Sequence, residues 1–77
     1  MSGMGALVID IMSYEAGELE ARETLELFGV LIKSGMAWTL QGSYGRTANE
    51  LMHMGYLTTD GELTEFAEEM LGEMAAA

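Results

Sequence analysis

The stretch that decides the fold is Thr39–Glu65, TLQGSYGRTANELMHMGYLTTDGELTE, because its glycines and hydroxyl residues mark where elements begin and end. Gly42 is expected to break the preceding segment. Ser43 is expected to cap a helix, since a serine oxygen accepts a hydrogen bond from the first helical turn. Gly55 is expected to end that helix, because glycine adopts a left-handed helix stop at little cost. The face of this helix that is predicted to turn inward carries Ala48, Leu51 and Met52.

The second half of the stretch predicts a turn followed by a last helix. Residues 56–58, Tyr-Leu-Thr, are expected to form a brief strand or extended bridge, and residues 59–62, Thr-Asp-Gly-Glu, a tight turn. Leu63 and Thr64 have the pattern of a hydrophobic staple and an N-cap. The side chains of the last helix that are predicted to face inward are Phe66, Met70, Leu71 and Met74.

Two more helices are predicted upstream of this stretch. Residues 4–16 form the first and end at Gly17, and residues 20–34 form the second and end at Gly35. Residues 36–41 fit either a short extended piece or one more helical turn. The predicted apolar stripes are Met4, Leu7, Val8, Ile11 and Met12 in the first helix, and Ala21, Leu25, Phe28, Leu31 and Ile32 in the second.

These patterns predict an all-α protein: one compact four-helix domain over residues 1–77, with the option of a short hairpin stub at 56–63. A chain of 77 residues has room for one domain and buries only about 60% of its unfolded surface. It has no cysteine, so no disulfide reinforces the fold, and its eight methionines add apolar, adaptable surface. We therefore expect a homo-oligomer.

The net charge of −10 is concentrated in two segments. Residues 10–26 carry six acids and Arg22, residues 62–73 carry five acids and no base, and the charges between them balance. Such a field repels phosphates and attracts basic partners. The alternative is that the acidic faces only keep an apolar chain in solution.

Arg22 lies four residues from both Glu18 and Glu26, a spacing that predicts ion pairs within the second helix.

Catalysis is not expected from these residues. His53 is the only histidine, and it has a methionine on either side and no orienting carboxylate. Ser13, Ser34 and Ser43 lie in no recognised nucleophile context. No segment supplies the alternating oxygen ligands of a calcium loop. We therefore expect no enzyme, no metal site and no cofactor.

The apolar run at residues 6–9 is broken at Asp10, too early for a signal peptide or a membrane span, so a cytoplasmic protein is expected.

Two patterns in the sequence are similar to nucleic-acid-binding motifs. Residues 42–45, Gly-Ser-Tyr-Gly, have the form of the Gly-x-x-Gly loop that clamps nucleotide backbones. Residues 45–65 resemble the second half of a winged helix-turn-helix, with a recognition helix, a glycine stop, a Thr-Asp-Gly wing turn and a helix that opens with Leu-Thr. This resemblance implies a backbone shape and, as an alternative function, a DNA-binding regulator. A DNA reader carries several Lys or Arg residues here, whereas this chain offers Arg46 alone, so we expect no nucleic-acid partner.

A second resemblance covers residues 9–57, and its distinctive part is Trp38–Ala48, WTLQGSYGRTA. Together with residues 14–19, YEAGEL, this block resembles a family of short proteins of tailed phages that infect actinobacteria. The resemblance implies a phage setting and the cytoplasm of a bacterial host, and it supplies no activity. The acidic last helix lies outside it.

The same block holds the candidate site, which consists of Trp38, Gln41, Tyr44 and Arg46. In one interpretation they form a structural corner in which Trp38 is buried and Arg46 is paired, because a cation near a helix start needs an acceptor. In the other they form an exposed binding spot, since Trp, Tyr and Arg are enriched in such spots. We expect a non-enzymatic phage accessory protein that acts by contact with itself or with a basic host or phage protein. A DNA-binding regulator and an acidic nucleic-acid mimic that inhibits a basic host protein are the alternatives.

Overall fold

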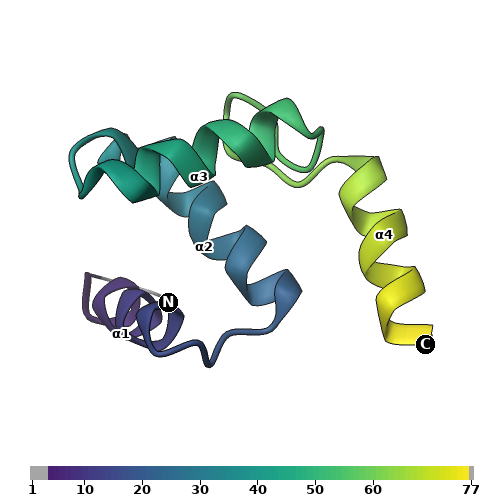
Figure 1. Cartoon of the computed structure of the whole chain (residues 1–77), viewed down its shortest axis with the longest axis horizontal. Helices are drawn as coiled ribbons and strands as arrows, with labels where there is room; N and C mark the ends of the chain where they lie inside the picture. The colour runs from purple at the N-terminus through teal and green to yellow at the C-terminus, as the bar shows by residue number, and fades with distance from the viewer. Residues whose placement is uncertain (1–3, 77) are drawn as a thin grey trace.

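The computed structural model describes the backbone of residues 4–76 and the side chains of residues 7–74. Its α-helices are α1 (Met4–Glu15), α2 (Ala21–Ser34), α3 (Gly42–His53) and α4 (Glu65–Ala76), and a 3-10 turn, η1 (Met36–Trp38), joins α2 to α3. Helix α2 runs through the middle of the molecule, α1 and α4 lie on opposite sides of it, and α3 crosses the top of the view in Figure 1. Residues 4–76 contain no strand, so the all-α prediction is confirmed.

Glycines end the first three helices, as the sequence predicts. The φ angles of Gly17, Gly35 and Gly55 are 75°, 83° and 87°, a region that side chains disfavour. The left-handed turn brings the Gly17 amide to the Tyr14 carbonyl oxygen at 3.0 Å, which satisfies a carbonyl at the end of α1. Of the two alternatives for residues 36–41, an extended piece or one more helical turn, the structure has the helical turn, as η1.

The start of α4 follows the sequence prediction, and the start of α3 does not. Thr64 caps α4, because its Oγ1 accepts a hydrogen bond from the Ala67 amide at 3.0 Å. In α3 the carbonyl oxygen of Gln41 already accepts the Tyr44 amide at 2.9 Å, so the helix begins at Gly42. Ser43 therefore lies inside the first turn, and its prediction as the N-cap is wrong.

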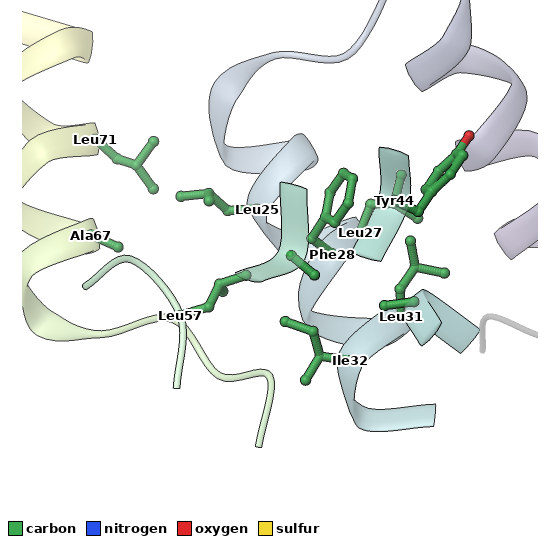
Figure 2. Close-up of a cluster of buried hydrophobic side chains, with 11 residues drawn as sticks. Leu25, Leu27, Phe28, Leu31, Ile32, Tyr44, Leu57, Ala67 and Leu71 are labelled. Atoms are coloured by element: carbon green, nitrogen blue, oxygen red, sulfur yellow. The ribbon is translucent and has the colours of Figure 1, made fainter. Parts of the chain in front are cut away.

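The core is built around α2. Phe28 and Leu31 are fully buried, and Leu27 is buried as well, although the predicted stripe left it out. The stripe is wider than predicted because α1 and α4 cover two sides of the same helix (Figure 1). The buried hydrophobic residues, most of which Figure 2 labels, are Leu25, Leu27, Phe28, Leu31, Ile32, Ala37, Tyr44, Ala48, Leu57, Ala67 and Leu71.

Helix α1 contacts the rest of the protein through one face only. Leu7, Ile11 and Tyr14 pack against the core, whereas Val8 and Met12, which belong to the same predicted apolar stripe, are exposed. Helix α1 packs mainly against α2 and meets α3 only at its C-terminal end, so its outer apolar face is not covered by other described residues. The prediction for Met4 falls outside the described side chains.

In α4 the inward face is rotated from the predicted one. Ala67 and Leu71 are buried, while Phe66 and Met74 are exposed. Phe66 instead stacks on Tyr56, with ring centroids 5.3 Å apart and an interplanar angle of 25°. Ala67 and Leu71 thus mark the face of α4 that meets the core, and Phe66 lies to the side of it.

Residues 56–64 form a turn that docks on α2. Leu57 and Leu63 pair as an isolated antiparallel bridge, which confirms the predicted bridge. The Gly61 amide donates to the Thr58 carbonyl oxygen at 2.9 Å, so the tight turn spans residues 58–61, one residue earlier than predicted. The turn begins early because Thr58 Oγ1 accepts the amides of Asp60 and Glu62 at 3.2 and 3.1 Å.

The tip of this turn lies against the backbone of α2. A Cβ atom at Gly29 would clash with the carbonyl oxygen of Gly61, and a Cβ atom at Gly61 would clash with the carbonyl oxygen of Gly29. Two glycines therefore let the turn and the helix touch through their backbones. This contact holds residues 56–64 between α3 and α4 at a fixed place on α2.

Candidate interaction surface

The four residues of the candidate site lie at the junction of η1 and α3, but they do not form one cluster. Tyr44 is buried, Gln41 and Arg46 are exposed, and 49% of the Trp38 surface is exposed. Among residues 7–74, no acidic side chain lies within ion-pair distance of Arg46. The corner with a buried Trp38 and a paired Arg46 is therefore wrong. Arg46 falls midway between Tyr44 and Ala48 in sequence, which places it on the opposite face of α3.

Trp38 is half covered because its ring rests on α3. A Cβ atom at Gly45 would lie 3.6 Å from Cε3 of Trp38, so the ring packs against the glycine backbone. The rest of the ring meets solvent. Trp38 is thus held in place by α3 while one part of it remains accessible.

Of the four residues, Tyr44 has a structural role of the kind that the corner interpretation predicts. Its ring lies 6.0 Å from Phe28 and 5.8 Å from Tyr14, between centroids, and joins α1, α2 and α3 in one aromatic group. Its hydroxyl donates a hydrogen bond to Glu15 Oε2 at 2.5 Å. Burial, followed by this bond to a carboxylate, raises the pKa of Tyr44 to about 12. Tyr44 therefore fastens α3 to the end of α1.

The other motifs and residues with possible chemistry do not come together as a site within residues 7–74. Residues 42–45 form the first turn of α3 with Tyr44 buried, so they are not the exposed loop of a Gly-x-x-Gly clamp. His53 is exposed at the end of α3. Within residues 7–74, no three His, Cys, Asp or Glu side chains are grouped to hold a metal ion. Among the helices of residues 4–76, none has the length and apolar character needed to cross a membrane.

Arg22 connects two helices that are distant in sequence. Its guanidinium donates to Glu68 of α4, with Nη2 at 2.7 Å from Oε1 and Nη1 at 3.4 Å from Oε2. The predicted pairs with Glu18 and Glu26 are not formed, because α4 presents a carboxylate that both guanidinium nitrogens reach. The hydrogen bond from Arg22 lowers the pKa of Glu68, although both side chains are about half exposed.

Beside this ion pair, an apolar groove runs between α2 and α4. It has a volume of about 300 Å³, and threonine is the most polar residue that lines it. Figure 2 shows Leu25 of α2 facing Leu71 of α4 at its base. Met70 and Met74 of α4 form its more accessible wall. The lining residues are Leu19, Ala21, Thr24, Leu25, Leu51, Tyr56, Ala67, Met70, Leu71 and Met74.

Acidic side chains border this groove. Glu68 directly follows Ala67 and Glu73 directly precedes Met74, and at about 3.6 residues per turn these steps place the two carboxylates at opposite edges of the apolar stripe of α4. A neighbouring hollow that shares Ala21, Leu71 and Met74 with the groove is also lined by Glu20 and Arg22. The groove is therefore an apolar surface with a negative rim in which Arg22 is the one basic lining residue.

The sequence does not reveal this groove, because its pattern predicts that Phe66, Met70, Leu71 and Met74 all face the core. The spacing of Ala67, Met70, Leu71 and Met74 is that of a helix face, but it does not say what covers that face. Sequence signals for an accessible surface were the two methionines in a short acidic helix, since methionine is frequent at adaptable binding surfaces. The residues of α2 and Tyr56 that complete the groove carry no sign of it in their own stretches of sequence.

Comparisons with known proteins give one family and no closer relative. No curated protein and no solved structure matches the chain. A family model matches residues 1–75, which include the acidic helix α4 that the phage resemblance left out. The chain therefore belongs to the family described as Domain of unknown function (DUF7417).

Proposed function

We propose that this chain is a small, acidic, non-enzymatic accessory protein of a tailed phage. It works in the host cytoplasm through contacts with other proteins and with copies of itself. The phage setting rests on the resemblance of the Trp38–Ala48 block, and the genes that flank the coding sequence test it.

The observation that carries the proposal is the apolar outer face of α1. Val8, Ile9 and Met12 are exposed on this helix, while Leu7 and Ile11 on its other side pack against the core. A helix that is apolar on both sides is normally covered on both sides. Within residues 7–15, α1 carries Asp10 and Glu15 as its only charges, so two copies would meet there with little repulsion.

The absence of buried charge supports a non-enzymatic role. Among residues 7–74, no Asp, Glu, Lys, Arg or His side chain is buried. Catalytic acids and bases at neutral pH usually depend on burial or close charges to shift their pKa. Contacts through apolar surface need no such groups.

Three exposed methionines on different surfaces allow a matched test. Met12 of α1, Met54 after α3 and Met74 of α4 are 64%, 57% and 58% exposed, so a change to Glu adds the same charge at similar exposure. Analytical ultracentrifugation should show an oligomer for the unmodified chain and for Met54→Glu, and a monomer for Met12→Glu. A monomer of the unmodified chain at tens of micromolar would refute self-association.

The same protein samples separate the alternatives. Fluorescence anisotropy with duplex DNA at low salt should show no saturable binding. Saturable binding that weakens steeply as salt rises would favour the DNA-binding regulator, because counterion release makes such binding salt-dependent. Competition with DNA for a basic host protein would favour the nucleic-acid mimic.

A further inference from the structure

We propose that the groove between α2 and α4 binds a basic amphipathic helix of another protein. This inference rests on the proposed function, since it names the class of partner for one surface. The groove is distinct from the exposed face of α1, so the two surfaces can be tested separately.

The floor and walls of the groove fit the apolar face of a helix. Ala67, Met70, Leu71 and Met74 follow one another along α4 at intervals of three, one and three residues, which makes a continuous ridge about two turns long. Leu25 and other residues of α2 form the opposite wall. A partner helix with apolar side chains at similar intervals can lie in such a groove. The methionines on the accessible wall adjust their shape to the partner.

The charge around the groove selects the partner. Helix α4 carries Glu65, Glu68, Glu69 and Glu73 and no base. Arg22 neutralises Glu68 alone. Glu65 and Glu69 lie on the face of α4 turned away from the apolar stripe, so the carboxylates left at the rim are those of Glu73 and Glu20. A helix with lysine or arginine on either side of its apolar stripe would meet these two carboxylates, and the attraction would also speed the encounter.

A second copy of this chain does not supply such a helix. Each copy has a net charge of −10. Within the described helices, the bases of α2 and α3 are matched by equal numbers of acids, and α4 has acids only. No described helix of the chain is therefore basic, and two grooves would repel each other. The occupant that fits both the apolar lining and the rim is a cationic helix from a different protein.

The probe for this proposal is a labelled peptide of leucine and lysine, about 15 residues long, the length at which an isolated helix begins to be stable. Its leucines are spaced for one helical face. A second peptide has the same composition in an order that destroys this face. Fluorescence anisotropy measures both peptides against the full chain, at low and at physiological salt, with Met74→Glu and Met54→Glu as variants. Circular dichroism confirms that each variant is folded.

The amphipathic peptide should bind the unmodified chain, and the reordered peptide should bind at least about tenfold more weakly, a difference of about 1.4 kcal/mol. Met74→Glu should weaken binding of the amphipathic peptide about tenfold, and Met54→Glu should not weaken it. Equal binding of the two peptides would mean that charge alone attracts them, and it would overturn the proposal. So would an equal response of the two variants, or no binding at all.

Sedimentation of the same variants distinguishes this proposal from self-association. If Met74→Glu dissociates the oligomer while Met12→Glu leaves it intact, a second copy occupies the groove and the proposal fails. If Met12→Glu dissociates the oligomer and Met74→Glu alone loses the peptide, both proposals hold. If the chain is a monomer that still binds the amphipathic peptide through Met74, only self-association fails.

Discussion

Replacing Gly29 by alanine tests the contact that places the turn on α2. Alanine is normally the better helix residue, and in an open helical position the change gains about 1 kcal/mol. At Gly29 the new Cβ would overlap the carbonyl oxygen of Gly61, a backbone atom that cannot rotate away. Crowding of a packed contact costs about 1–3 kcal/mol, and a backbone clash belongs at the upper end of that range. The net effect expected is a loss of about 1–2 kcal/mol.

Gly72 provides the matched control. It lies inside α4, and a Cβ atom there would meet nothing within 4 Å. Gly72→Ala should therefore stabilise the protein by about 0.5–1 kcal/mol, since only helix propensity acts. In a domain of this size each kcal/mol moves the Tm by about 4–8 °C.

Thermal unfolding followed by circular dichroism should show a lower Tm for Gly29→Ala and a higher Tm for Gly72→Ala. Because both variants make the same chemical change in a helix, the difference between them isolates the contact with the turn. An increase in Tm for both would refute the reasoning, since it would mean that the turn does not rest on Gly29.

Trp38→Ala should lower the free energy of unfolding in urea by about 2 kcal/mol, half the cost of truncating a fully buried Trp, because 49% of its surface is exposed. Arg46→Ala should leave the urea midpoint unchanged, and a large loss of stability in this variant would reveal a partner for the Arg46 charge. Thr64→Ala should cost about 1 kcal/mol through loss of the α4 cap, whereas Thr64→Ser keeps the oxygen and should stay close to the unmodified protein. The pKa of Tyr44 is raised from its usual value near 10 to about 12 by burial and the bond to Glu15, so its contribution to stability is complete below pH 10 and is lost as the pH rises to 12. Alkaline unfolding followed by tyrosinate absorbance should show this loss, and Tyr44→Phe should remove it.

Local chemistry explains which parts of the fold were predictable. The stops at Gly17, Gly35 and Gly55 and the cap at Thr64 depend on backbone conformation and on hydrogen bonds that span only a few residues. The helix boundaries that they set were therefore readable from neighbouring residues. The exception was the start of α3, where the carbonyl oxygen of Gln41 accepts the first helical hydrogen bond and Ser43 lies inside the first turn.

The sequence by itself determined that the chain forms helices, roughly where they begin and end, and that its charge is strongly negative. Only the tertiary structure decided which apolar faces are covered, because periodicity shows that a face exists but not what packs on it. Phe66 is exposed because the face of α4 that meets the core is centred on Ala67 and Leu71, and Met74 is exposed on the accessible wall of the groove. Arg22 pairs with Glu68, 46 residues further along the chain. The predicted site and the groove differ for the same reason. Trp38 and Arg46 were selected by residue type, whereas the groove between α2 and α4 forms only when the fold brings these two helices together.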